Sequence, residues 1–226
     1  MHTTNKNEIL LIGARIDGHA GVIVDTLKLM NGFELNEFID RTPELQGKTI
    51  CGVPVIGSSD DLAKFDFTGK LVHIAIGDNA ARKNIYRELK RLNAPLVTIV
   101  HPTAIISQDV EIGEGCFIAP GAIINNGTRV GPVSIINTGS IVEHDNEIGC
   151  AVHVAPGTTT AGRVTIKDLA FVGVGSTILP DIVVGEAVMV GAGSTVVKDV
   201  PSQTTIIGYA AQKHEKNIYV TTQKSG

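Results

Sequence analysis

Two patterns of hydrophobic and polar residues divide the chain near residue 102. Before that point, short apolar runs alternate with segments of helical spacing, such as 19–30 and 79–93. This alternation is typical of a parallel sheet with helices packed against it. We therefore predict a Rossmann-like α/β unit over residues 1–101, with strands in the segments 8–14, 33–40, 70–78 and 95–102.

From residue 106 onward the apolar pattern has a strict period of six. Every sixth position from Ile106 to Val196 holds Ile or Val, except for Thr160, and generally smaller residues stand two positions before. This period fits neither an α-helix nor ordinary strand alternation. It is typical of a parallel β-helix, whose short strands turn a corner and stack on the strands below. The repeat predicts about five three-sided coils over residues 102–208, and we treat residues 209–226 as a polar C-terminal tail.

Composition narrows the classes of function. The 226 residues are 43% apolar and 19% charged, with a formal net charge of −4, so the chain offers no basic patch for a nucleic acid. No apolar run approaches the roughly 20 residues needed to cross a bilayer, and residues 1–8 do not resemble a signal peptide. Cys51, Cys116 and Cys150 are far apart, which suits a reducing compartment. We expect a cytoplasmic protein without nucleic-acid or membrane partners.

Two histidines stand out within the repeat. His144 follows the inward-facing Val142 by two residues, so we expect it at a corner, between Glu143 and Asp145. A carboxylate beside an imidazole fixes its tautomer and favours a general base, although a solvated histidine in an acidic turn has the same pattern. His153 precedes an inward valine and should point outward from a flat face. No third histidine lies inside the repeat, so we expect no metal site.

The turn after the first strand is rich in glycine. Gly13, Gly18 and Gly21 do not form the G-x-G-x-x-G motif of dinucleotide-binding folds. A glycine-rich turn that leads into a helix nevertheless suits a phosphate group, because the first N–H groups of a helix are free and its dipole favours negative charge. Further along, Asn79 and Arg82 follow the strand at 70–78, where a phosphate or base contact is plausible.

Several segments together resemble one known family. They are "GHAGVIVDTL", "IAIGDNAARKNIY", "VHPTAIIS", "NTGSIVEHDNEIG", "HVAPGTTTAG" and "VGVGSTILPDI", in this order and over nearly the whole chain. The chain is similar to the bacterial sugar acyltransferases of the sialic-acid O-acetyltransferase type and of the bacillosamine-pathway and perosamine-type N-acetyltransferases. The hexapeptides alone would indicate only the wider fold, whereas "EHDNEIG" followed by "HVAPG" is much more specific.

The resemblance implies a left-handed β-helix, a homotrimer, and acetyl-CoA bound between adjacent β-helices as the co-substrate. It implies that His144 is the general base and that Asp145 orients it. It places the cofactor at His153 and at the backbone N–H of Gly162, which would stabilise the oxyanion. Gly173 and Gly175 lie where a close backbone approach would suit the pantetheine arm of the cofactor. The resemblance assigns the sugar nucleotide to Gly13, Gly18, His19, Asp40, Asn79 and Asn137. Many of these glycines could equally be corners of the repeat.

The preferred function is acetyl-CoA-dependent N-acetylation of a nucleotide-linked 4-amino-4,6-dideoxy sugar by direct transfer. O-acetylation of a sugar such as a sialic acid is the main alternative, and a non-catalytic sugar-nucleotide-binding scaffold is the alternative from another class. The chain departs from the family in a longer first turn, around Arg15 and Asp17, and in Ala210 where proline is common. The identity of the nucleotide stays open.

Overall fold

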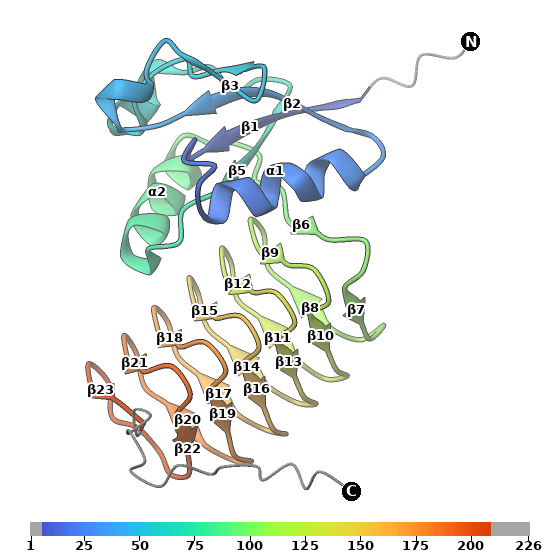
Figure 1. The fold of residues 1–226 in the computed structure, drawn as a ribbon, viewed down its shortest axis with the longest axis vertical. Helices are drawn as coiled ribbons and strands as arrows, with labels where there is room; N and C mark the ends of the chain where they lie inside the picture. Colours follow the sequence, from blue (N-terminus) through green and yellow to red (C-terminus); the bar gives the residue numbers. More distant parts are fainter. Residues whose placement is uncertain (1–5, 209–226) are drawn as a thin grey trace, which may run out of the picture.

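The computed structural model describes residues 6–208, which begin with a three-stranded parallel sheet in the order β2-β1-β5 (Figure 1). The elements of this N-terminal unit are β1 (Asn7–Ile12), α1 (His19–Leu29), β2 (Phe33–Ile39), η1 (Pro43–Leu45), β3 (Thr49–Ile50), β4 (Val53–Pro54), η2 (Ser59–Lys64), β5 (Lys70–Ile74) and α2 (Asn79–Arg91). The predicted α/β unit is confirmed. The predicted tail, residues 209–226 with Ala210, lies outside the described residues.

Strand β1 is buried on both faces. Ile9 and Leu11 pack on the side of α1, and Leu10 and Ile12 pack on the side of α2. All four side chains are at most 1% exposed. A central parallel strand covered on both faces reads as a continuous apolar run, which is why this segment shows no alternation in the sequence.

After α2 the chain winds into a left-handed parallel β-helix with three faces, each a ladder of two-residue strands (Figure 1). The β6 face contains β6 (Ile99–Val100), β9 (Phe117–Ile118), β12 (Ile135–Ile136), β15 (His153–Val154), β18 (Phe171–Val172), β21 (Met189–Val190) and β23 (Thr205–Ile206). The β7 face contains β7 (Ile105–Ile106), β10 (Ile123–Ile124), β13 (Ile141–Val142), β16 (Thr159–Thr160), β19 (Thr177–Ile178) and β22 (Thr195–Val196). The β8 face contains β8 (Glu111–Ile112), β11 (Arg129–Val130), β14 (Glu147–Ile148), β17 (Thr165–Ile166) and β20 (Val183–Val184).

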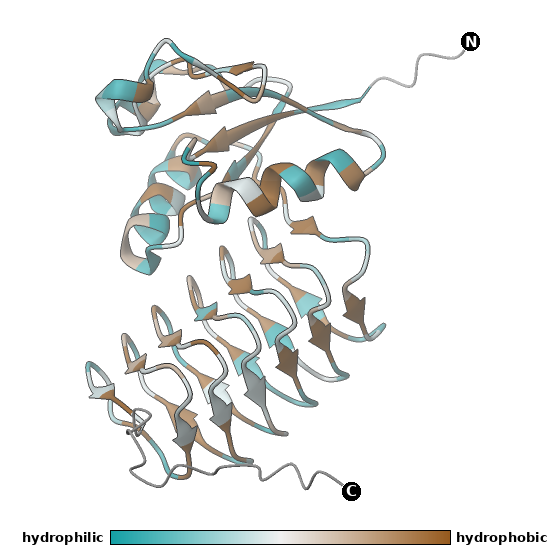
Figure 2. Cartoon of the chain, viewed as in Figure 1, coloured by the Kyte–Doolittle hydropathy of each residue, from teal (hydrophilic) through white to brown (hydrophobic). Residues whose placement is uncertain are grey.

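The six-residue repeat fills the axis of this β-helix. From Ile118 to Val196, every residue at the repeat position is at most 4% exposed, and Thr160 is the polar one among them. The residue before each repeat position faces away from the axis, because successive side chains of a strand alternate between its two sides. The hydropathy of these strands varies along and between the faces (Figure 2). The predicted β-helix is confirmed. The β8 and β7 faces hold five and six strands. The β6 face holds seven, because β6 and β23 extend its pairing beyond the strict repeat.

The N-terminal unit rests on the β6 face and on the neighbouring corner, with α1 and α2 between the sheet and the β-helix (Figure 1). Phe117 and Ile135 of the β6 face join the apolar cluster on the α1 side of the sheet. Val133 and Ala151, at the corner between the β8 and β6 faces, join the cluster on the α2 side. Both clusters of the sheet therefore continue into the β-helix.

One predicted strand is divided between the two units. The segment 95–102 was expected to close the N-terminal sheet, but only Leu96 bridges β5, through Val72. Ile99 and Val100 form β6, which pairs with β9 in the β-helix. The chain passes directly from the sheet to the first rung, so one apolar run serves both units. The pairing of the β-helix thus begins before residue 102.

Candidate active site

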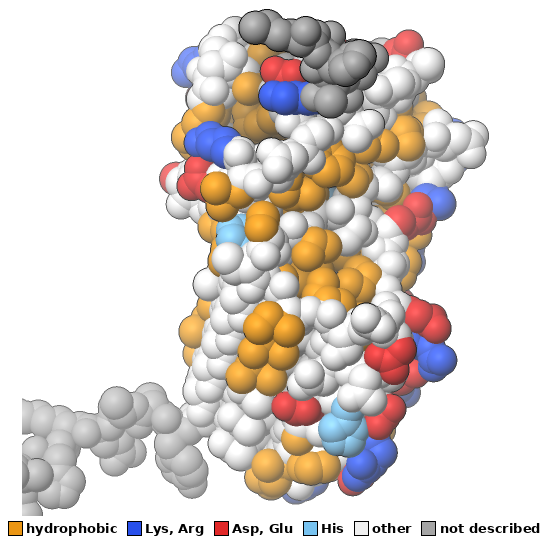
Figure 3. All heavy atoms as spheres, turned by 90° about the vertical axis from the view of Figure 1, so that its right-hand side faces the viewer, with side chains coloured by type: hydrophobic (Ala, Val, Ile, Leu, Met, Phe, Trp, Pro, Cys, Tyr) orange, Lys and Arg blue, Asp and Glu red, His pale blue; other side chains and the backbone are white. Residues whose placement is uncertain are grey.

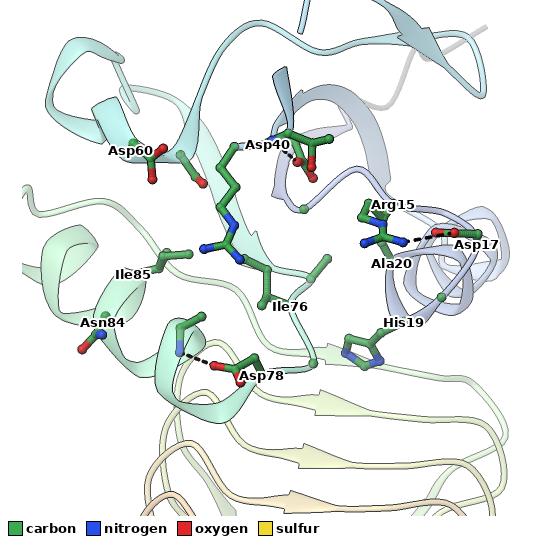
Figure 4. Close-up of a pocket in the computed structure, with 18 residues that line it drawn as sticks. Arg15, Asp17, His19, Ala20, Asp40, Asp60, Ile76, Asp78, Asn84 and Ile85 are labelled. Carbon is green, nitrogen blue, oxygen red and sulfur yellow. Dashed lines mark hydrogen bonds and ion pairs between the residues drawn. The ribbon is translucent and has the colours of Figure 1, made fainter. Parts of the chain in front are cut away.

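A cavity of about 880 Å³ opens at the carboxyl ends of the three parallel strands (Figure 4). The strand order β2-β1-β5 reverses beside β1, because the chain leaves β1 toward one side and later returns on the other. Ligands of open α/β sheets bind in the crevice at such a switch point. Four of the predicted substrate positions line this cavity, namely Gly13, Gly18, His19 and Asp40.

Glycines shape the turn that forms one wall of the cavity. Gly13 has φ +113°, and a Cβ there would lie 2.8 Å from the carbonyl oxygen of Ala75, so the ends of β1 and β5 could not approach. A Cβ at Gly21 would collide with the carbonyl oxygen of Ile16. Glycine at this position therefore allows the turn to pack against α1. Gly18 precedes α1, and no side chain caps the helix. The N–H of Gly21 donates to the carbonyl oxygen of Gly18, whereas the N–H groups of His19 and Ala20 have no acceptor within residues 6–208 and remain available to an anion.

Asp40 fastens two walls of the cavity together. Its Oδ2 accepts the N–H of Ala14 at 2.7 Å, and its Oδ1 accepts the N–H of Thr42 at 2.8 Å. Partial burial acts to raise the pKa of this carboxyl, but the hydrogen bonds outweigh burial and hold the pKa below its ordinary value. Asp40 is therefore ionised at neutral pH and fixes the turn after β1 against the end of β2.

The cavity carries both signs of charge. Arg15 and Asp17, which form the longer turn, pair at 3.4 Å with side chains that are 71% and 73% exposed (Figure 4). Asp78 caps α2 by accepting the N–H of Ala81 at 2.7 Å. Arg41, which the sequence analysis missed, lines the cavity and makes no side-chain hydrogen bond or ion pair within residues 6–208. Its guanidinium and the N–H groups of α1 give the cavity donors suited to a diphosphate.

Three imidazoles gather where the N-terminal unit meets the β6 face, of which His73 and His153 are buried and His19 is half-buried. The ring of Phe117 lies 5.3 Å from that of His19 and 6.3 Å from that of His73, and the rings of His19 and His153 are 6.2 Å apart. Burial, with a smaller contribution from nearby cationic groups such as Arg82, lowers the pKa to about 3 for His19 and to about 4 for His73 and His153. All three are neutral at neutral pH.

His153 therefore points outward from a face, as expected, but α1 covers it. The Nδ2 of Asn137 lies 2.9 Å from its Nε2. The N–H of Thr138 donates to the Oδ1 of Asn137 at 2.8 Å, which fixes the orientation of this amide. Nε2 of His153 must then accept, so its proton is on Nδ1. Through His19, this pair adjoins the cavity.

His144 lies in the turn between β13 and β14, at the corner of the β7 and β8 faces. Its Nδ1 is 2.8 Å from the Oδ2 of Asp145, and its side chain is 42% exposed. Donation from Nδ1–H to this carboxylate leaves Nε2 as the proton acceptor. A Cβ at Gly162, one coil further on, would lie 2.5 Å from Cε1 and Nε2 of His144, so the ring rests directly on this glycine.

The backbone N–H of Gly162 has no acceptor within residues 6–208. The corner therefore brings together a fixed imidazole, its orienting carboxylate and a free N–H donor. A general base and an oxyanion donor need this arrangement.

Three other predicted site residues, Asn79, Gly173 and Gly175, lie outside the cavity and away from the His144 corner. Asn79 lies where α2 meets the β-helix, and its Nδ2 donates to the carbonyl oxygens of Leu169 and Ala170 at 3.1 and 2.9 Å. A Cβ at Gly173 would lie 2.6 Å from the carbonyl oxygen of Val190, so this glycine allows coils to stack. Gly175 is in an open turn with φ +65°. Arg82, a possible phosphate contact by sequence, lies outside the cavity.

Within one chain the predicted residues form two separate groups. The cavity, His19, Asn137 and His153 lie on or beside the β6 face. His144, Asp145 and Gly162 occupy the corner between the other two faces, which is the edge opposite the β6 face. His73, which the sequence analysis did not select, also belongs to the first group. The one sequence signal for its burial is its position within the apolar strand β5.

An α/β unit with a switch-point cavity, joined to a hexapeptide β-helix that carries an imidazole at a corner, defines the class of sugar acyltransferases. The model of the PglD N-terminal domain matches residues 8–89. A histidine-to-asparagine variant of perosamine N-acetyltransferase from Caulobacter crescentus, in complex with CoA and GDP-perosamine, is 33% identical, with a TM-score of 0.82 over 89% of this chain and 93% of that chain.

Two further structures are similar. The acetyltransferase domain of PglB from Neisseria gonorrhoeae, in complex with acetyl coenzyme A, is 28% identical, with a TM-score of 0.83 over 90% of this chain and 97% of that chain. WeeI from Acinetobacter baumannii is 28% identical, with a TM-score of 0.76 over 88% of this chain and 96% of that chain. The chain belongs to this family of bacterial sugar acyltransferases and is an enzyme of the acyltransferase class.

Among residues 6–208, no group of three or more His, Cys, Asp or Glu side chains is arranged to hold a metal ion. In the same part of the chain, no helix combines the length and apolar character needed to span a bilayer.

Proposed function

We propose that this enzyme transfers the acetyl group of acetyl-CoA to the 4-amino group of a nucleotide-linked 4-amino-4,6-dideoxy sugar, with His144 as the general base. The observation that carries this proposal is the corner where Nε2 of His144 lies against Gly162 while Nδ1 is held by Asp145. The switch-point cavity supports a nucleotide-linked acceptor. The relative from Caulobacter crescentus, with CoA and GDP-perosamine bound, supports both substrates.

The chemistry is direct transfer. The amine lone pair attacks the thioester carbonyl carbon, and the N–H of Gly162 donates to the oxygen that becomes negative. Nε2 of His144 removes the proton from the attacking nitrogen, and the positive imidazolium is stabilised by Asp145. The C–S bond then breaks, an amide forms, and the CoA thiolate receives the proton from His144. No acyl-enzyme intermediate is required.

The arrangement of the two groups supports a site shared between chains. Within one chain, His144 lies at the edge opposite the β6 face and therefore far from the cavity. We infer that the base acting on a sugar held in one cavity is the His144 of an adjacent copy. The β7 face offers a surface for this association. Its outward ladder begins with Ile105, which is 63% exposed, and continues with the half-buried Ile123 and Ile141. Figure 3 shows hydrophobic side chains gathered along this side. We propose a homotrimer with three such shared sites.

O-acetylation of an unlinked sugar such as a sialic acid is the second candidate. The same base and N–H donor would serve a hydroxyl nucleophile equally well. It gives no role to the cavity at the ends of β1, β2 and β5, however. The cavity therefore favours the nucleotide-linked acceptor.

The test is a panel of GDP-, UDP- and dTDP-linked 4-amino-4,6-dideoxy sugars and sialic acid, with release of CoA thiol as the readout. We expect turnover with at least one nucleotide-linked amino sugar, and a loss of roughly 10²–10⁴-fold in kcat for His144→Ala. Glu143→Gln is the matched control, since the Glu143 side chain makes no hydrogen bond within the described residues. Near wild-type turnover by His144→Ala would remove the assigned base.

A mixing experiment tests the shared site. Asp40→Ala impairs the cavity and His144→Ala impairs the corner, so each variant alone should be nearly inactive. Hetero-oligomers of the two variants should regain activity, because some sites combine an intact cavity with an intact corner. A mixture no more active than its components would show that each site belongs to one chain.

A further inference from the structure

The segment Gly77–Arg82, which begins α2, contains a buried arginine that the proposed mechanism does not use. Arg82 is 1% exposed. Its Nε donates to the carbonyl oxygen of Val133 at 2.6 Å, and its Nη1 donates to the carbonyl oxygens of Ile76 at 2.9 Å and Gly77 at 3.0 Å. Its Nη2 donates to the Oδ1 of Asn79 at 2.7 Å, and to the carbonyl oxygens of Ala151 at 3.1 Å and Val152 at 3.3 Å.

These acceptors belong to the two halves of the molecule. Ile76 and Gly77 line the cavity. Val133, Ala151 and Val152 belong to two successive coils of the β-helix, and Val152 directly precedes His153. One guanidinium therefore connects the floor of the cavity to the backbone that carries His153.

Every hydrogen-bond acceptor of Arg82 is neutral, and the Asp78 carboxylate acts on its charge only from beyond hydrogen-bond distance. Burial lowers its pKa to about 10, so the side chain stays charged at neutral pH. Without Arg82, several buried carbonyl groups would lose a donor, at a cost that such groups usually avoid. A lysine has a single ammonium group and cannot reproduce the planar fork that reaches both halves. Apolar contacts of Phe117 and Ile135 already attach the N-terminal unit, but such contacts are not directional.

We propose that Arg82 is a positioning residue for acetyl transfer, which fixes the nucleotide cavity at one height above the coils that carry Asn137 and His153. The proposal rests on the proposed function. A sugar held by its nucleotide reaches the transfer site only if this height is correct, and a displacement of about 1 Å can cost roughly 10²-fold in rate. Asn79 assists by accepting from Arg82 while it donates to Leu169 and Ala170.

The test compares Arg82→Lys with wild type in two measurements. The first is kcat and KM for the accepted sugar nucleotide. The second is the Kd of GDP by calorimetry, which reports on the cavity alone. We expect kcat to fall by about 10- to 100-fold, while the Kd of GDP changes by less than about threefold. Asn79→Ala should shift kcat in the same direction by a smaller factor, and it keeps the test readable if Arg82→Lys folds poorly.

Arg87→Lys is the matched control, because Arg87 is an exposed arginine on the same helix with no side-chain hydrogen bond among residues 6–208. It should leave kcat and Kd unchanged. Unchanged kcat in Arg82→Lys, or equal losses in kcat and in GDP affinity, would overturn the positioning role. If wild type and Arg87→Lys acetylate none of the sugar nucleotides, the proposed function fails instead, so the two failures are distinguishable.

Discussion

Replacing Gly162 with alanine adds one methyl group against the proposed base. The backbone of Gly162 is not in the left-handed region, so alanine fits its conformation without strain. The new Cβ would lie 2.5 Å from Cε1 and Nε2 of His144, whereas ordinary van der Waals contact begins at 3.4 Å. The imidazole must therefore withdraw by about 0.9 Å. Since the His144 side chain is 42% exposed, it can swing outward, and we expect a stability loss of at most about 1 kcal/mol.

The catalytic effect should be much larger than the effect on stability. Gly162→Ala keeps the backbone N–H, so a loss of rate reports the displaced base rather than a lost oxyanion donor. A shift of this size should lower kcat by roughly 10- to 100-fold. The assay is the initial rate of thiol release at saturating substrates, with thermal unfolding measured on the same samples.

A double-mutant cycle supplies the control. In His144→Ala the ring that the methyl group would strike is absent, so adding Gly162→Ala should change kcat by less than about twofold. Gly162→Ala with wild-type kcat would refute the contact between this glycine and the base. Independent, multiplicative losses in the double variant would refute the reasoning that the methyl group acts through His144.

Two further predictions concern stability. Thr160 is buried on the axis and its hydroxyl has no partner among the described residues, so Thr160→Val should raise the free energy of unfolding by about 1 kcal/mol in denaturant titrations. Thr158→Val should instead lower it, because the hydroxyl of Thr158 donates to Gly173. The free energy of unfolding should also fall as the pH drops from 6.5 toward 4. His73 and His153 stay neutral in the fold, with pKa values of about 4, while the unfolded chain takes up protons below about 6.5.

The acid effect should reach on the order of 3 kcal/mol for each of these buried histidines. A stability that is flat between pH 6.5 and 4 would contradict the burial of His73 and His153 as neutral imidazoles. A stabilising Thr158→Val would contradict the account of the threonine hydroxyls.

The repeat made the β-helix predictable because it constrains every coil in the same way. Once Val142 and Val154 face the axis, His144 must lie at a corner and His153 on a face, as the structure has them. The proximity of His144 and Gly162 follows from their separation by one coil. These relations are local, so a sequence pattern can carry them.

Relations between the two units could not be predicted in the same way. The pattern around Asn79 and Arg82 is compatible with contacts to a phosphate. In the structure α2 docks on the β-helix, and both side chains donate to its carbonyl oxygens instead. The covering of His153 by α1 likewise depends on that docking. The division of the segment 95–102 depends on the pairing of Ile99 with β9 of the β-helix instead of with the N-terminal sheet. No short-range periodicity encodes these contacts.

The most direct test of the central claim is the chemical nature of the product formed from acetyl-CoA and a GDP-linked 4-amino-4,6-dideoxy sugar. The proposed function predicts one acetyl group per sugar, in an amide that survives alkaline hydroxylamine, as followed by mass spectrometry. It also predicts that His144→Ala forms this product at a rate lower by roughly 10²–10⁴-fold. An acetyl group removed by hydroxylamine would identify an ester and O-acetylation. No acetylated product from any nucleotide-linked amino sugar, together with acetylation of sialic acid, would contradict the claim.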